Sequence, residues 1–344
     1  MNKKIRYTVQ APLLGYLRDH DRIAKIPLKH VDLLRFTSSI PLMDTKGQDT
    51  LWETVFYSSS EMKEINGKLK EIYALLKTAG DISVMEHLYV ERIDFCAFGN
   101  SQPFRVKIVN HFNDNHDYFY LKVPDASRVY GLELEHILSP NRINYLINEE
   151  TLIEEHIIGI PGDQFIERNL KDKDLNQIRL GKEFVKFNER CFVRLLGDMR
   201  SYNFVIDMTA DFDDTQFRFR AIDFDQQCYE GRKSIYLPQY FEENQSYVEL
   251  CVRLLNAEVV KQYQQEERAL IGRRVKSSRH RLNELLGAIV HDEISTPEKT
   301  EVLRAGLARH YSHPDFMQCR TMGEMVKESL RLLLEKNERT QILP

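Results

Sequence analysis

The chain has 344 residues and a mass of 40.6 kDa, which at about 150 residues per domain predicts two domains or one large one. Hydrophobic residues make up 42% and charged residues 29% of the sequence, which excludes collagen, low-complexity disorder and a pure coiled coil. The 48 basic and 52 acidic residues give a net charge of −4, which excludes a protein that binds polyanions through its overall charge.

The beginning of the chain is basic, but the segment after Arg6 is too short and too polar for the apolar core of a signal peptide. The sequence has no run of about 18 apolar residues, so we expect no membrane partner. Its five cysteines are scattered without a C-x-x-C pair, which argues against a disulfide framework and a thiolate zinc site. We therefore expect a soluble, cytoplasmic protein.

The N-terminal part of the chain contains one strong helical pattern. Residues 1–48 are expected to be irregular, because three prolines interrupt them. Residues 49–78 place apolar side chains three to four positions apart, which predicts helix. The serines at 58–60 can divide this run into two helices, with Ser60 as the N-cap of the second.

Three strands are predicted next, over residues 88–95, 104–110 and 118–123. In the second, apolar residues alternate with Arg105 and Lys107, as expected for a strand with one buried face. Turn-forming residues separate the second strand from the third. The three strands together predict an antiparallel meander.

The remaining chain first mixes helices with strands and then becomes helical. We expect a helix over 127–138, strands near 143–148 and 151–158, a buried helix over 173–196, and a hairpin with strands 203–207 and 217–225. The acidic turn 211–214 fits no EF-hand spacing and is expected to be a polar turn rather than a calcium site. Helices are then expected near 247–267, near 275–290, and after the caps Ser295 and Thr321.

The strongest chemical signal comes from three polar residues around this hairpin. Asp198 and Asn203 lie five residues apart in a loop between the buried helix and the first hairpin strand, and Asp223 ends the second. This arrangement is expected to bring three oxygen-bearing side chains together. Mg²⁺ takes such hard oxygen ligands, keeps several waters and needs only one or two carboxylates from the protein. An aspartate beside an acceptor hydroxyl also orients it and accepts its proton.

The pattern Gly-Asp-x-x-x-x-Asn followed by Ile-Asp-Phe-Asp resembles the catalytic loop and metal-binding segment of the protein kinase-like superfamily. It is more similar to the aminoglycoside, choline and phosphoinositide kinase branches than to ordinary Ser/Thr kinases. The resemblance implies that Asp198 is the catalytic base and that Asn203 and Asp223 bind Mg²⁺. Asp225 has no certain counterpart in the family and is included as an assisting metal ligand. It also implies an α+β, two-lobed fold with a small antiparallel-sheet N-lobe and a mostly helical C-lobe.

The resemblance covers roughly residues 88–230 and implies nucleotide contacts upstream of this loop. Lys122, at the end of the third strand, matches the lysine that binds the α- and β-phosphates. Glu133 or Glu135 in the following helix matches its ion-pair partner, and the sequence does not choose between them.

Two further segments complete the nucleotide contacts that the resemblance implies. The loop containing Gly99 and Ser101 takes the place of the phosphate loop. Glu154, Glu155 and His156 match the hinge, whose backbone holds adenine.

The implied organisation is an N-terminal, partly helical extension over 1–85, an N-lobe over 86–160, and a C-lobe with a helical tail over 161–344. The implied function is an ATP- and Mg²⁺-dependent phosphotransferase that moves the γ-phosphoryl group to a hydroxyl acceptor of unknown identity. The acceptor could be a small molecule or a protein.

The sequence also departs from the family pattern. The presumed phosphate loop has one glycine, no His-Arg precedes Asp198, and no Ala-Pro-Glu follows Asp225. These departures point away from a protein acceptor more than from nucleotide binding. The alternative hypothesis is a pseudokinase, or a nucleotide-binding or protein-interaction module without turnover.

Two other clusters are interpreted more simply. The basic residues between 273 and 281 are expected to form a solvated helix face, with docking of an anionic partner as a third hypothesis and no nucleic acid expected. His310 and His313 lie near a predicted helix end and are interpreted as a pair that lacks a third ligand, so no metal site is predicted there.

Overall fold

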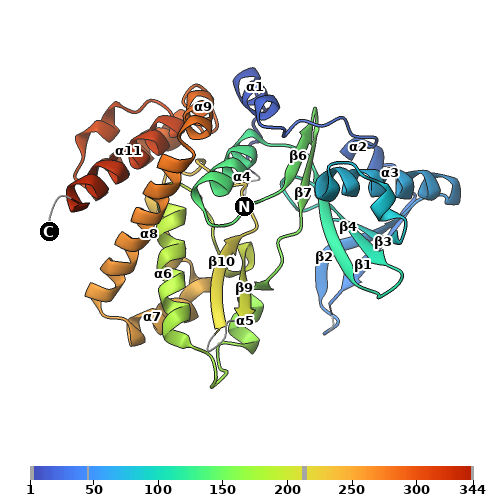
Figure 1. Cartoon of the computed structure of the whole chain (residues 1–344), viewed down its shortest axis with the longest axis horizontal. Helices are drawn as coiled ribbons and strands as arrows, with labels where there is room; N and C mark the ends of the chain where they lie inside the picture. Colours follow the sequence, from blue (N-terminus) through green and yellow to red (C-terminus); the bar gives the residue numbers. More distant parts are fainter. Residues whose placement is uncertain (1–3, 45, 211–214, 342–344) are drawn as a thin grey trace. The chain divides into compact units, whose positions relative to one another are not determined.

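The computed structural model describes residues 4–44, 46–210 and 215–341, and it is α+β (Figure 1). The chain divides into two compact units. Unit 1 comprises residues 1–125 and 143–156, and unit 2 comprises residues 126–142 and 157–344. Unit 1 contains a large antiparallel sheet, and unit 2 is mostly helical. Within the described residues, no helix combines the length and the apolar character that a membrane crossing requires.

The sheet of unit 1 has the strand order β1-β2-β3-β4-β5-β7-β6, and every neighbouring pair is antiparallel. Its strands are β1 (Ser38–Met43), β2 (Asp49–Phe56), β3 (Leu88–Phe95), β4 (Phe104–Asn110), β5 (His116–Lys122), β6 (Tyr145–Asn148) and β7 (Thr151–Glu155). The predicted meander is confirmed as β3, β4 and β5. In β4 the residues Phe104, Val106 and Ile108 are buried, as their alternation with charged residues predicted.

The N-terminal segment is more regular than expected, so the prediction of an irregular stretch over 1–48 is wrong. It contains α1 (Ala11–Asp19), α2 (His30–Leu33) and strand β1. Two of the three prolines that indicated irregular structure stand where regular elements tolerate them, and Pro27 lies in the irregular stretch between α1 and α2. Pro12 lies in the first turn of α1, where its missing N–H breaks no helical bond, and Pro41 lies in an outermost strand of the sheet.

The helix prediction for residues 49–78 is half right. The second part forms α3 (Ser59–Thr78), whose N-cap is Ser58 rather than Ser60 and makes a capping box with Glu61. Residues 49–56 form strand β2 instead, because this stretch is rich in β-branched and aromatic residues and pairs with β1 and β3. The apolar face of α3 packs on the sheet, with Leu69 and Ile72 fully buried.

Unit 2 combines a three-stranded antiparallel sheet, in the order β10-β9-β8, with helices. The strands are β8 (Ile160–Pro161), β9 (Phe204–Ala210) and β10 (Thr215–Ala221). The helices are α4 (Ala126–Leu138), α5 (Gly162–Arg168), α6 (Gln177–Val193), α7 (Gln245–Leu254), α8 (Ala257–Ser277), α9 (Arg279–Ile289), α10 (Pro297–Tyr311) and α11 (Met322–Gln341). Short 3₁₀ turns are η1 (Ser83–Met85) in unit 1 and, in unit 2, η2 (Ser201–Asn203), η3 (Lys233–Tyr236), η4 (Pro238–Tyr240), η5 (Glu242–Asn244) and η6 (Pro314–Gln318).

An aromatic cluster joins α6, the hairpin and α7. Phe187 of α6 stacks on Phe219 of β10 at 5.7 Å between ring centroids, and Phe204 of β9 meets Phe219 at 5.4 Å. Tyr247 of α7 packs against Phe204 and donates its hydroxyl to the carbonyl of Gly162. These rings are almost fully buried, so the hairpin is held rigidly beside the loop that precedes it.

The C-terminal helices follow the prediction with shifted ends. The single helix expected near 247–267 is interrupted between α7 and α8, where Asn256 caps α8 by accepting the N–H of Val259. Thr296 rather than Ser295 caps α10, whereas Thr321 caps α11 as expected, accepting the N–H of Glu324 at 3.1 Å. The acidic turn 211–214 lies outside the described residues.

Candidate active site in unit 2

A constrained loop connects α6 to η2 and carries Asp198. Leu195 and Asp198 both adopt φ of 57°, a left-handed conformation that non-glycine residues rarely take. Between them, a Cβ on Gly197 would lie 3.0 Å from Ile235 and 3.1 Å from the carbonyl oxygen of Gln226. The N–H of Asp198 donates to the carbonyl of Ile235 at 3.0 Å. The surrounding backbone therefore fixes this loop in one conformation.

Asp198 is partly exposed and lies beside an arginine. Its side chain is 31% exposed, and its Oδ1 accepts a 2.8 Å bond from Nε of Arg200, which also pairs with Glu243. Burial raises the pKa of Asp198 above its ordinary value, while Arg200 opposes that rise. A carboxylate with a raised pKa and an accessible oxygen is suited to receiving a proton.

Asn203 ends η2 and connects the loop to the hairpin. Its side-chain Nδ2 donates to the backbone carbonyl of Asp198 at 2.8 Å. The backbone carbonyl of Asn203 accepts the N–H of Ile222 at 3.0 Å. The structure thus brings Asn203 next to the residue that precedes Asp223. Because the side-chain bond of Asn203 uses its amide nitrogen, the amide oxygen is left for a cation or water.

Asp223 and Asp225 share a buried arginine that the sequence analysis missed. Nη1 of Arg128, on α4, lies 2.8 Å from Oδ1 of each aspartate, and the Arg128 side chain is 2% exposed. The N–H of Asp225 also donates to Oδ1 of Asp223. An arginine within the otherwise apolar start of α4 is the sequence signal that could have identified this residue.

The two aspartates differ in access, and this decides which suits a metal. The side chain of Asp223 is 37% exposed, whereas that of Asp225 is 10% exposed. The Asp223 carboxylate and the Asn203 amide oxygen are hard donors of the kind that Mg²⁺ takes, alongside retained waters. The described residues therefore fit Mg²⁺ at Asp223 and Asn203, and Asp225 fits better as a partner of Arg128.

In unit 1, Lys122 is buried at the end of β5. Its Nζ lies 2.7 Å from Oε2 of Glu154 on the adjacent strand β7 and 5.1 Å from the ring centroid of Tyr120. Burial raises the pKa of Tyr120 to about 12, so its hydroxyl remains protonated. Lys122 is thus held by a strand carboxylate, a partner that the sequence analysis had placed in the hinge.

The two helix glutamates have partners within unit 2. Oε2 of Glu133 accepts two bonds from Arg281, at 3.2 and 2.6 Å, and Glu135 forms a buried ion pair with Arg194. Because Lys122 belongs to unit 1, its pairing with one of these glutamates stays a prediction. Arg281 shows that the basic segment 273–281 contributes at least one internal ion pair.

The presumed phosphate loop and hinge are ordered by local bonds. Ser101 is buried, with 5% exposure, and its carbonyl accepts the N–H of Val123. A Cβ on Gly99 would lie 2.7 Å from Cδ of Pro103, so this turn packs tightly. In the hinge, Nδ1 of His156 lies 3.0 Å from the hydroxyl of Tyr120, and Oε1 of Glu155 accepts the N–H of Asn144. Their roles toward a nucleotide stay predictions.

The sequence matches no protein-family model, and no curated protein matches it with significance.

Proposed function

We propose that this protein is an ATP- and Mg²⁺-dependent phosphotransferase of the kinase-like type, acting on a hydroxyl acceptor. The observation that carries the proposal is the linked arrangement of Asp198, Asn203 and Asp223 in unit 2. Two backbone-anchored bonds connect them, from Asn203 to the Asp198 carbonyl and from Ile222 to the Asn203 carbonyl. These bonds hold close to one another the segments that carry the base and the metal ligands assigned by the kinase-like resemblance, and this supports the proposal.

In the proposed reaction, the acceptor oxygen forms a bond to the γ-phosphorus while the bond from that phosphorus to the β,γ-bridging oxygen breaks. Asp198 orients the acceptor hydroxyl and receives its proton, so that ADP and the phosphorylated acceptor are the products. Lys122 contributes a positive charge toward the nucleotide phosphates. When bound to Asp223 and Asn203, Mg²⁺ supplies charge neutralisation at the phosphates.

The first experiment is a thermal-shift titration with ATP, with and without MgCl₂. A ligand that binds only the folded state raises the unfolding midpoint. We expect a magnesium-dependent rise in the wild-type protein that is lost in Asp223→Asn and retained in Asp225→Asn. Asp225→Asn is the matched control, because both aspartates contact Arg128 and only Asp223 is well exposed. Absence of any shift at millimolar ATP would refute the nucleotide site.

A second experiment tests the base. Transfer to a panel of small hydroxyl acceptors should be abolished in Asp198→Asn while the magnesium-dependent midpoint shift remains. Because Arg200 lowers the pKa of Asp198, Arg200→Gln should move the acidic limb of the kcat/KM profile to higher pH. An acidic limb that stays in place in this variant would contradict the assignment of Asp198 as the titrating base.

The alternative, nucleotide binding without turnover, is favoured by one observation in unit 1. In the loop that the resemblance assigns to the phosphates, Ser101 is buried, with 5% exposure, so its hydroxyl is poorly placed to reach a phosphate. This alternative expects the same magnesium-dependent shift, with no transfer and no ATP hydrolysis in the wild-type protein. Single-turnover measurement of ADP formation distinguishes the two functions.

A further inference from the structure

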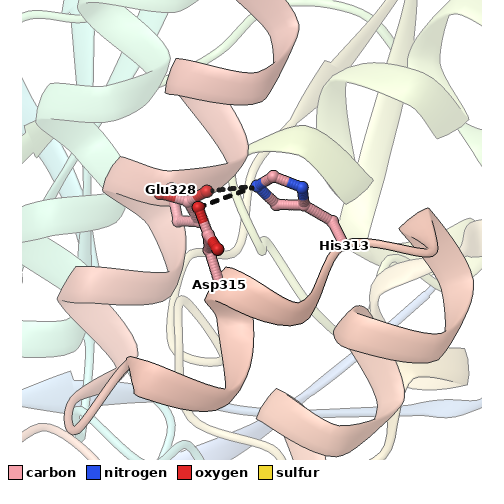
Figure 2. Close-up of side chains that lie close together, drawn as sticks. All are labelled: His313, Asp315 and Glu328. Atoms are coloured by element: carbon pink, nitrogen blue, oxygen red, sulfur yellow. Dashed lines mark hydrogen bonds and ion pairs between the residues drawn. The ribbon is translucent and has the colours of Figure 1, made fainter.

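A histidine and two carboxylates meet in unit 2, outside the candidate active site. His313 follows the end of α10, Asp315 lies in η6, and Glu328 lies on α11, so that three separate elements converge (Figure 2). The sequence predicts no metal site here, because the pair His310 and His313 lacks a third ligand. In the fold His313 is joined instead by Asp315, two residues along the chain, and by Glu328, 15 residues along the chain.

The three side chains present their ligand atoms to one point. Nε2 of His313 lies 2.8 Å from Oε1 of Glu328 and 3.6 Å from Oδ2 of Asp315 (Figure 2), and all three atoms lie within 4.8 Å of one another. Their side chains are 21%, 14% and 45% exposed for His313, Glu328 and Asp315 respectively, so the point is reachable from solvent. Nδ1 of the neighbouring His310 lies 3.3 Å from Nζ of Lys233.

A cationic nitrogen already occupies this point. Nη2 of Arg331 lies 2.8 Å from Oδ2 of Asp315, 2.7 Å from Oε1 of Glu328 and 3.3 Å from Nε2 of His313. A neutral imidazole cannot form a hydrogen bond with both Arg331 and Glu328 through Nε2. If Nε2 carries a proton, that N–H also faces the N–H groups of Arg331, and if it carries none, its lone pair faces the Glu328 oxygen. A compact cation at the centre would satisfy all three lone pairs together.

The guanidinium of Arg331 has a second carboxylate partner outside the cluster. Its side chain is 46% exposed, and its Nη1 lies 2.6 Å from Oε1 of Glu335, one helical turn further along α11. When the guanidinium turns toward Glu335, the carboxylates of Asp315 and Glu328 become available to a metal ion.

We propose that His313, Asp315 and Glu328 form a binding site for a divalent transition metal, Zn²⁺ by preference, which replaces Nη2 of Arg331. Zinc binds imidazole nitrogen and carboxylate oxygen at about 2.0–2.2 Å. For an ion at the position of Nη2, each ligand atom therefore needs to move toward that position by only about 1 Å. The imidazole favours zinc over magnesium or calcium. The Asp315 side chain is 45% exposed, so a water molecule can reach the site as a fourth ligand.

This metal site is independent of the proposed phosphotransferase function. It ties the segment after α10 to α11, so binding should stabilise the fold rather than assist transfer. Loss of nucleotide binding would leave the proposal unaffected, and loss of zinc binding would leave the proposed function unaffected.

The test is a titration of the metal-free full chain with ZnCl₂, followed by calorimetry and by the unfolding midpoint, with Co²⁺ absorption as the spectroscopic readout. We expect one equivalent to bind and to raise the midpoint. Affinity should fall at least about tenfold in His313→Ala and rise in Arg331→Gln, which removes the competing cation. His280→Ala is the matched control, because His280 is 89% exposed and lies 3.3 Å from a single carboxylate, Glu284.

Three outcomes would overturn the proposal. The first is an absence of zinc binding in both the wild-type protein and Arg331→Gln. The second is unchanged affinity in His313→Ala with a native circular-dichroism spectrum, and the third is an equal loss in His280→Ala. If His313→Ala fails to fold, Glu328→Gln replaces it, because glutamine keeps the size of the side chain and removes the anionic ligand.

Discussion

Replacing Arg128 with methionine isolates the buried charge at the candidate active site. Methionine has a similar length and no charge, so the change leaves Asp223 and Asp225 facing each other without the guanidinium that now lies 2.8 Å from both. Two carboxylates held close together repel, and one of them is almost fully buried. The variant therefore tests how much the buried guanidinium stabilises this pair of aspartates.

The expected cost follows from burial. Removing one partner of a buried ion pair costs about 3–5 kcal/mol, because the remaining charge is left uncompensated. For a unit of roughly 200 residues, at about 2–4 °C per kcal/mol, this lowers the unfolding midpoint by about 6–20 °C. Urea unfolding of the full chain, followed by circular dichroism, measures the free energy directly. Under the proposed function, MgCl₂ should restore part of this loss by supplying positive charge to Asp223.

Arg35→Met provides the control, because Arg35 is 68% exposed and its pair with Asp32 should contribute no more than about 0.5 kcal/mol. If Arg128→Met lowers the free energy of unfolding by as little as Arg35→Met does, the stabilising role of the buried guanidinium is refuted. A double-mutant cycle with Asp225→Asn gives a further check, since the two effects should be strongly non-additive.

Three further outcomes are expected. Gly323→Ala should lower the free energy of unfolding by at least about 1–3 kcal/mol, because its Cβ would lie 2.1 Å from the Ile289 carbonyl oxygen. Gly306→Ala, whose Cβ would lie 3.7 Å from its nearest neighbour, should raise that free energy by about 0.5–1 kcal/mol in the same urea assay. Burial lowers the pKa of His156 below 6.5, so the unfolded chain takes up this proton first as pH falls. Its contribution to stability is therefore present above pH 6.5 and lost below it, and His156→Asn should flatten the acid side of a midpoint-against-pH curve; an unchanged slope would contradict this. Cys191 is fully buried, so the native protein should leave it unlabelled by a thiol reagent that reacts with Cys96, as peptide mass spectrometry would show.

The parts of the fold that could be predicted are those where local pattern and tertiary environment agree. Strand β4 alternates because one of its faces is buried, and α6 repeats because its apolar stripe packs on the hairpin. Strand β2 was missed for the opposite reason. The spacing of Leu51, Val55 and Phe56 fits a helix. The β-branched and aromatic composition of this stretch and its pairing with β1 and with the sequence-distant β3 make it a strand.

The site divides in the same way. The juxtaposition of Asn203 with the start of the Asp223 segment could be predicted, because the two flank one hairpin and lie at the same end of it. Arg128 could not, because it comes from a helix 95 positions before Asp223 and depends on how that helix packs within unit 2. The ligand set around His313 escaped prediction for the same reason.

The outermost strand β1 has a consequence for how the protein behaves at high concentration. Among the described residues, β1 lies at one edge of its sheet and pairs with β2 alone. Ile40 and Met43 on this strand are 58% and 53% exposed. Such an edge is a template for pairing between molecules. Pro41 interrupts it, because proline has no N–H to offer an incoming strand. Pro41→Val should therefore increase the aggregation of the protein on concentration, as light scattering would measure, with little change in the fold itself.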